Sequence, residues 1–318
     1  MLPVTGMTAI AETGRQSIYR RFVRREIFGI HCVIAGFWAL FLAVLLQATG
    51  AAANPSILLA AAGANPNLKA QILAQDEVGE CACGPCSIFN AFQFGDAGLN
   101  RLASRLPGDA PADKVRCLIR MYGEKPSVIS RDEPRYLAQG GMWDADLVPF
   151  ANDWLKDSGA PPVTGERLTP RWNETAGEHL QRVYNQLSHS LAAGFPPVVN
   201  LQSYVARRNL FHHYWKWMDG HFVTVVGVQH TLPGDASRFS MWVADSQTGK
   251  MLEVTVSADG NRPSSTMAES RAQRSGRESA HPAGNGPYLT IQSPRLETIL
   301  EGNVTNQTIC VLQYMVHR

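Results

Sequence analysis

Three cysteines occur within six residues, just before an apolar segment that ends at Gly95. They are Cys81, Cys83 and Cys86, and the stretch 85–94 has the apolar content and glycine stop signal that predict a helix. A thiol at the N-terminus of a helix has a lowered pKa, because unpaired backbone N–H groups and the helix dipole stabilise the thiolate. The pattern therefore predicts a nucleophilic cysteine, with Cys83 at the start of the helix.

A nucleophilic thiol needs a base, and His221 is the candidate. It precedes an otherwise apolar segment, 221–228, that predicts a strand with the ring at its first position. The next predicted strand, 239–244, is followed directly by Asp245. In an antiparallel hairpin, a carboxylate at the end of one strand can lie beside a ring at the start of its neighbour. We therefore expect Asp245 to accept the second N–H of His221 and orient the ring.

The side-chain amide of Gln75 is the candidate oxyanion donor, acting together with the backbone N–H of Cys83. Each candidate also has a simpler interpretation. His221 would be a solvent-facing residue at a strand entry, Asp245 a turn cap and Gln75 a solvated loop residue.

Two other chemistries compete for the cysteine cluster. Cys83-Gly84-Pro85-Cys86 is the dithiol motif that thioredoxins carry, although the polar segment 75–80 before it cannot form the buried strand found there. A metal site would combine the thiols with His212 and His213, but structural zinc usually needs two ligand pairs of defined spacing. The second such pair is missing, so no metal ion and no other cofactor is expected.

The N-terminus predicts export. An uncharged apolar run, 27–46, is followed by Ala51-Ala52-Ala53, an A-x-A cleavage site before Asn54. The basic residues that precede the run are Arg15, Arg20, Arg21, Arg24 and Arg25. Residues 1–53 are thus either a cleaved signal peptide or a retained anchor crossing the inner membrane through residues 27–47. In both cases the basic flank stays in the cytoplasm, and the rest of the chain is periplasmic or secreted.

The cysteine count fits an oxidising compartment. Besides Cys32 in the apolar run there are five cysteines, an odd number that suggests two disulfides and one free thiol. We expect Cys81 or Cys86 to form a disulfide with Cys117 or Cys310.

Composition excludes few functions. The 318 residues are 45% hydrophobic and 18% charged, which indicates a globular chain with a substantial core. The net charge of +2 gives no field that would attract nucleic acid or a membrane surface, so neither is expected as an electrostatic partner.

The order of elements predicts an α+β fold, with helices first and strands second. Further helices are expected at 112–122, 144–157 and 176–191, and further strands at 197–201, 251–256, 288–291 and 308–316. Residues 54–74 are interpreted as a linker and 75–318 as one domain. Within that domain, 259–287 is rich in Ser, Arg, Gly and Pro and is interpreted as a mobile insert.

The chain resembles the papain-like cysteine peptidases in four segments that occur in the same order. These are Gln75, Cys83-Gly84-Pro85, Gly220-His221-Phe222 and Asp245. They are most similar to the double-glycine leader peptidases that process bacteriocins. The segment 194–200, a helix end leading into a strand, also resembles that family. The resemblance implies a helical half, carrying the nucleophile helix, packed on an antiparallel sheet that carries the histidine and the acid. It implies a peptidase acting on a peptide or protein through a thioester.

The family places its glutamine six residues before the nucleophile. Gln75 lies six residues before Cys81 and eight before Cys83, whereas a papain-type Cys-Gly-x-Cys register selects Cys86. All three thiols therefore remain candidates, with Cys83 favoured. The rival functions are an exported thiol-disulfide oxidoreductase, which would need both Cys83 and Cys86, and a papain-like binding protein without activity.

Overall fold

The computed structural model describes residues 57–59, 72–208, 213–259, 288–292 and 308–318. All of them belong to the second of two units into which the chain divides after Pro55. Five α-helices occur in these ranges: α2 (Cys83–Phe94), α3 (Ala97–Arg105), α4 (Pro111–Leu118), α5 (Asp144–Asp157) and α6 (Ala176–Ala192). A 3-10 turn, η2 (Gln75–Glu77), precedes α2, and a π-helical turn, η3 (Ile119–Gly123), extends α4.

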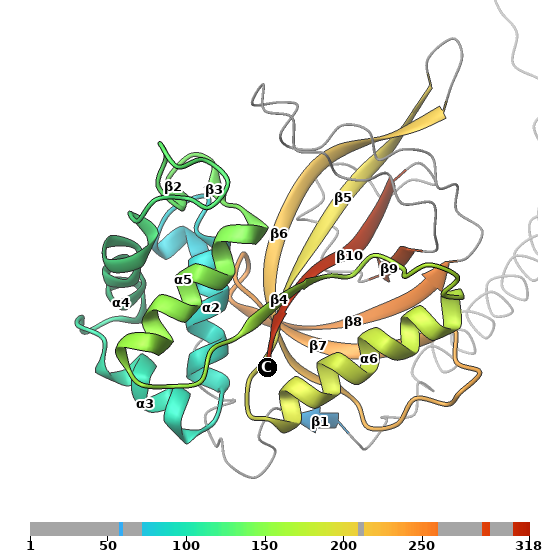
Figure 1. The fold of residues 1–318 in the computed structure, drawn as a ribbon, viewed down its shortest axis with the longest axis horizontal. Helices are drawn as coiled ribbons and strands as arrows, with labels where there is room; N and C mark the ends of the chain where they lie inside the picture. Colours follow the sequence, from blue (N-terminus) through green and yellow to red (C-terminus); the bar gives the residue numbers. More distant parts are fainter. Residues whose placement is uncertain (1–56, 60–71, 209–212, 260–287, 293–307) are drawn as a thin grey trace, which may run out of the picture. The chain divides into compact units, whose positions relative to one another are not determined.

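Six antiparallel strands close into a barrel (Figure 1). They are β5 (Val198–Arg208), β6 (His213–Gln229), β7 (Arg238–Asp245), β8 (Lys250–Asp259), β9 (Tyr288–Gln292) and β10 (Thr308–His317). Their order is β6-β5-β10-β9-β8-β7, and β7 pairs again with β6. Closure leaves fewer unpaired strand edges, which in an open sheet would expose backbone N–H and C=O groups.

Four short strands complete the described structure. The strand β1 (Ile57–Leu59) pairs with β6, and β4 (Thr164–Arg167) pairs with β10. A separate two-stranded ribbon forms from β2 (Tyr136–Leu137) and β3 (Gly141–Met142). This ribbon contacts α2, the helix that begins at Cys83.

Two large hydrophobic cores and one small cluster occur among the described residues. In the first, α2 packs against α5 and the barrel wall, where Phe92 stacks on Trp154 with ring centroids 3.9 Å apart. In the second, Leu180, Val183 and Leu187 of α6 pack with buried residues of the barrel strands. Figure 1 shows the consequence: α2 to α5 gather on one side of the barrel, and α6 lies across its strands.

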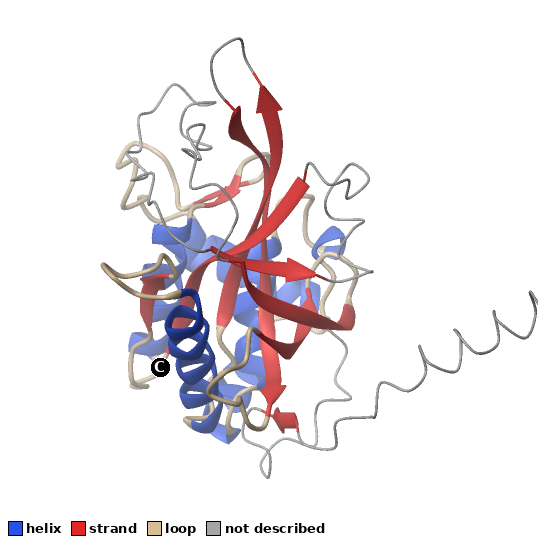
Figure 2. Cartoon of the chain, turned by 90° about the vertical axis from the view of Figure 1, so that its right-hand side faces the viewer, coloured by secondary structure: helices blue, strands red, loops and turns tan. Residues whose placement is uncertain are grey.

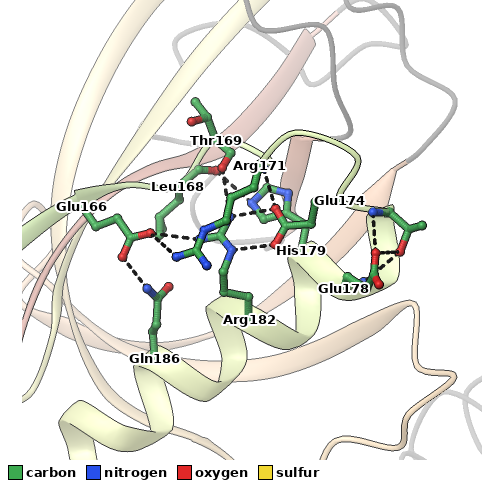
Figure 3. Close-up of polar contacts among 10 residues, drawn as sticks. Glu166, Leu168, Thr169, Arg171, Glu174, Glu178, His179, Arg182 and Gln186 are labelled. Carbon is green, nitrogen blue, oxygen red and sulfur yellow. Dashed lines mark hydrogen bonds and ion pairs between the residues drawn. The ribbon is translucent and has the colours of Figure 1, made fainter.

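A charged network holds α6 to β4 and to the loop between them (Figure 3). The Arg182 guanidinium donates two hydrogen bonds to the Glu174 carboxylate, at 2.7 and 3.0 Å, and one to Glu166 Oε1 at 3.1 Å. Thr175 and Glu178 form a capping box at the start of α6, with each side chain bonded to the other's backbone N–H. The helix is therefore fixed at its N-terminus and along one face.

The predicted α+β class is confirmed, and the sheet is a closed barrel. The helix predicted at 144–157 has those bounds in α5, and every strand predicted in the second half is present. The prediction that His221 opens its strand is wrong, because β6 begins at His213. The strands β5 and β6 continue past the barrel as a two-stranded ribbon, and this pairing includes residues 213–220 (Figures 1 and 2).

Several predictions fall outside the described residues. These are the signal or anchor at 1–53, most of the linker at 54–74, and nearly all of the insert at 259–287. In the ranges that are described, no helix is both long and apolar enough to cross a bilayer.

Candidate active site

Cys83 is the first residue of α2, and its side chain is half-buried. Ala82 precedes the helix and has no side-chain oxygen, so it accepts no hydrogen bond from the first backbone N–H groups of α2. Pro85 lies in the first turn, where its missing N–H costs no intrahelical hydrogen bond. The chain therefore places a thiol at the positive end of an apolar helix.

His221 lies within β6, and Asp245 is the last residue of β7. In the antiparallel register Val223 lies opposite Asp245, which puts His221 diagonally across from the carboxylate and on the same face of the sheet. The His221 Nε2–H donates to Asp245 Oδ1 at 2.7 Å. The structure thus brings together the two residues that the hairpin prediction paired.

Asp245 also closes the turn between β7 and β8. It accepts the backbone N–H groups of Gln247 and Thr248, each at 3.0 Å, and the Thr248 hydroxyl at 2.5 Å. Its side chain is fully buried. Both interpretations of Asp245 therefore apply, because one carboxylate caps the turn and orients the ring.

These contacts determine the ionisation of the pair. Burial alone would raise the pKa of Asp245, but its hydrogen bonds from His221, Thr248 and Gln247 leave that pKa below its usual value. Burial alone would lower the pKa of His221. The hydrogen bonds and negative charges of Asp245 and Cys83 outweigh it and raise the pKa of His221 to about 9.

Cys83 is therefore the third member of a chain of contacts. Its side chain hydrogen-bonds to His221, and its charge adds to the attraction. Because Asp245 occupies Nε2, the ring nitrogen left for Cys83 is Nδ1. Only the thiol end of this chain is open to solvent, since His221 is 4% exposed and Asp245 is fully buried.

Gln75 lies next to the Asp245 turn. Its backbone N–H donates to the carbonyl of Ser246 at 2.5 Å, which ties η2 to the residue that follows Asp245. Its side-chain Nε2 donates to the carbonyl of Glu80 at 2.8 Å, across the loop that leads to the thiols. One of the two Nε2 hydrogens is used there, and the second leaves the amide with donor capacity.

The other two thiols differ from Cys83. Cys86 is fully buried, and desolvation together with the charge of Cys83 raises its pKa far above the usual range, so it stays protonated. Cys81 is half-buried and lies ahead of α2, outside the helix. Of the three candidates, only Cys83 both starts the helix and perturbs His221.

The expected disulfide is not formed. Cys81, Cys83, Cys86, Cys117 and Cys310 are all unbridged. Cys310 is buried in the barrel core, whereas Cys86 packs in the helical core. That separation explains why these two thiols do not pair.

Thr248 is a site residue that the sequence analysis did not single out, although a hydroxyl three residues after Asp245 is a common turn feature.

Within the described ranges, no group of three or more His, Cys, Asp or Glu residues is placed to hold a metal ion. No protein-family model, curated protein or solved structure matches this chain.

Proposed function

We propose that the protein is an exported cysteine peptidase or amidase in which Cys83 is the nucleophile, His221 the base and Asp245 the residue that orients the base. The observation that carries the proposal is the 2.7 Å hydrogen bond from His221 to Asp245, beside a Cys83 whose hydrogen bond and charge help to raise the pKa of His221. A thiol, an imidazole and a carboxylate in this order are the parts that nucleophilic acyl transfer requires.

The proposed reaction has two steps. The Cys83 thiolate attacks the carbonyl carbon of a peptide bond, a C–S bond forms, and the C–N bond breaks as protonated His221 gives its proton to the leaving amine. Water then adds to the thioester while His221 takes a proton from it. The C–S bond then breaks and the acid product leaves, which restores the Cys83 thiolate beside protonated His221.

Oxyanion stabilisation is assigned to Gln75 and the first N–H groups of α2. The helix begins at Cys83, so its N-terminal N–H groups point toward the region where the carbonyl oxygen would become negative. The backbone bond from Gln75 to Ser246 supports this role, because it fixes the amide beside the catalytic turn.

A papain-like arrangement is part of the proposal. It is supported by a helix that carries the thiol at its N-terminus and lies against strands that carry the histidine and the acid. Export is proposed from the sequence of residues 1–53 alone. The site would then act on a peptide or protein in the periplasm or outside the cell.

The dithiol alternative explains less of the geometry. Thiol-disulfide exchange through Cys83 and Cys86 has no use for a buried imidazole held by a carboxylate. A binding protein without activity would likewise leave the Cys83–His221 contact without a role. The proposed peptidase accounts for all of these residues.

The test is peptide cleavage by the full-length protein. We expect a proteome-derived peptide library to gain new termini with the wild type and none with Cys83→Ser or His221→Asn, measured by mass spectrometry. Cys86→Ser should retain cleavage. Loss of cleavage in Cys86→Ser, together with insulin reduction by the wild type that survives His221→Asn, would replace the peptidase by the oxidoreductase.

A further inference from the structure

A cluster of uncharged hydroxyl groups joins the three elements of the candidate site. Ser87 Oγ donates to the backbone carbonyl of Phe222 at 2.8 Å, and Ser246 Oγ donates to the same oxygen at 3.0 Å. The two hydroxyl oxygens are 3.4 Å apart. Thr224 Oγ1 donates in the opposite direction, to the carbonyl of Ser87 at 2.7 Å. We call Ser87, Phe222, Thr224 and Ser246 the hydroxyl cluster.

Three of the four members of the cluster sit beside a catalytic candidate. Ser87 is one helical turn after Cys83 on α2, and Phe222 directly follows His221 on β6. Ser246 directly follows Asp245. Two hydroxyls from different elements therefore converge on the one carbonyl that adjoins the proposed base.

The cluster is built for position and adds no charge. Ser87, Thr224 and Ser246 are fully buried. A buried charge at this place would shift the ionisation of the thiol and imidazole, whereas neutral hydrogen bonds fix distance and direction only. Misplacement by about 1 Å can cost roughly 10²-fold in rate, so such fixing matters for a proton-transfer pair.

We propose that Ser87 and Ser246 are positioning residues that hold the Cys83 thiol at hydrogen-bonding distance from His221. The hydroxyls act through the Phe222 carbonyl, which links the nucleophile helix to the strand of the base and the turn of the acid. This inference rests on the proposed function, because it assigns the cluster to the same thiol-imidazole pair.

The test measures the reactivity of Cys83 without any substrate. Full-length protein is alkylated with iodoacetamide between pH 5 and 10, and modification of Cys83 is separated from that of Cys81 by fragment ions in mass spectrometry. A thiolate paired with His221 reacts well below the usual thiol pKa of about 8.5. Other titratable groups couple to this region through their charges, and they are the same in every variant: Asp76, Glu77, Cys81, Cys86 and Tyr136.

The double variant Ser87→Ala/Ser246→Ala should lose about tenfold in Cys83 alkylation rate at pH 6, the change expected for a shift of about one pKa unit. Ser190→Ala is the matched control. The Ser190 hydroxyl is also fully buried and donates to a backbone carbonyl, that of Phe195, at 2.8 Å, but it lies on α6. We expect this control to stay within about twofold of the wild type and to show how far a lost buried hydroxyl lowers the melting temperature.

The outcomes separate this inference from the proposed function. If wild type and His221→Asn share the profile of an ordinary thiol, the peptidase proposal fails and the inference with it. A second outcome is that Cys83 reactivity near pH 6 depends on His221, while the folded double variant reacts within twofold of the wild type. In that case only the positioning role is overturned. If the double variant does not fold, the single variants decide, since each leaves one hydroxyl on the Phe222 carbonyl. A loss of about threefold in each is expected, and no loss in either overturns the role.

Discussion

Two polar networks fasten helices to the barrel, and they are built differently. At α2 the groups are neutral hydroxyls and backbone carbonyls, all buried, beside Cys83 and His221. At α6 the groups are the charged side chains of Arg182, Glu166 and Glu174, with Glu166 30% exposed (Figure 3). The α6 network includes none of the catalytic candidates.

The difference follows from what each helix has to do. A charged network can stabilise α6 because no nearby group depends on a tuned pKa. Beside α2, added charges would compete with the mutual attraction of Cys83, His221 and Asp245. We therefore expect changes in the α2 region to alter reactivity, and changes in the α6 network to alter the free energy of unfolding.

The largest effect is expected at the nucleophile. Cys83→Ser should reduce peptide cleavage to background, because serine is a far weaker nucleophile without ionisation; single losses on the order of 10⁶-fold are known for catalytic nucleophiles. The melting temperature should stay near that of the wild type, since the thiol is half-buried and serine is similar in size. Retained cleavage in this variant, with loss in Cys81→Ser, would move the nucleophile to Cys81.

Removal of the acid should have the next largest effect. Asp245→Ala takes away the acceptor at His221 Nε2, and we expect a loss of about 10³ to 10⁴-fold in kcat/KM. In the wild type, activity should fall as the pH rises through about 9, because protonated His221 is then lost. In the pH–activity profile of Asp245→Ala, the fall on the alkaline side should move to lower pH, since Asp245 is one cause of the raised His221 pKa. If the alkaline side of the profile does not move, a group other than His221 controls activity near pH 9.

The same shifts predict how stability follows pH. The pKa of His221 is raised from 6.5 to about 9, so its interactions stabilise the fold fully below pH 6.5 and are lost as the pH rises through about 9. The pKa of Asp245 is lowered, so its contribution is present above its usual value of 3.8 and is lost as the pH falls through the lowered one. The difference in melting temperature between wild type and Asp245→Ala should shrink as the pH falls toward 3. It should shrink only in part above pH 9, because the bonds from Gln247 and Thr248 to Asp245 remain there.

The oxyanion donor should matter less than the acid. Gln75→Ala should lower kcat by about 10² to 10³-fold, the usual effect of removing one such donor. Gln75→Glu keeps the shape but removes the N–H donors, so it should be at least as impaired. The backbone bond from residue 75 to Ser246 remains in both variants, which leaves the turn in place. Activity within twofold of the wild type in Gln75→Ala would assign the oxyanion to backbone donors alone.

The sequence predicted the elements of this site better than their contacts. Apolar periodicity located α2, α5, α6 and the barrel strands, because each buries one continuous face. The hairpin rule paired His221 with Asp245, because β6 and β7 are neighbours in sequence. Closure of the barrel depends on pairings such as β5 with β10, which join residues about 110 positions apart and leave no local signal.

Two features of the structure were not predicted from the sequence, for different reasons. The helix α3 was missed although Asp96 caps it by accepting the Leu99 N–H at 2.9 Å, a signal that the sequence contained. The hydroxyl cluster had no such signal. Ser87 is one polar residue in an apolar helix, and its partner is a backbone carbonyl 135 residues away. Only the folded register reveals it.

The α6 network should respond in stability alone. Arg182→Met leaves the Glu174 carboxylate, 9% exposed, without its guanidinium partner. We expect a loss of about 2 to 3 kcal/mol in the free energy of unfolding, below the full cost of an orphaned buried charge because the Arg171 backbone N–H still donates to Glu174 at 2.7 Å. Arg171→Met is the control. Its side chain is 65% exposed, so the loss should stay under about 0.5 kcal/mol. Neither variant should change Cys83 alkylation.

The smallest effects are expected at two threonines, one in the candidate site and one in the α6 network, which allows the two regions to be compared directly. Thr248→Ala removes a hydroxyl donor that helps to keep the pKa of Asp245 low, so activity should fall about threefold to tenfold. Thr175→Ala removes the hydroxyl that accepts the Glu178 N–H at 3.2 Å in the α6 capping box, which should cost about 1 kcal/mol of stability and leave activity within twofold. Cleavage assays and denaturant titrations on both variants measure the two quantities. The division between reactivity and stability fails if Thr175→Ala lowers kcat as much as Thr248→Ala does, because the α6 network would then reach the catalytic pair.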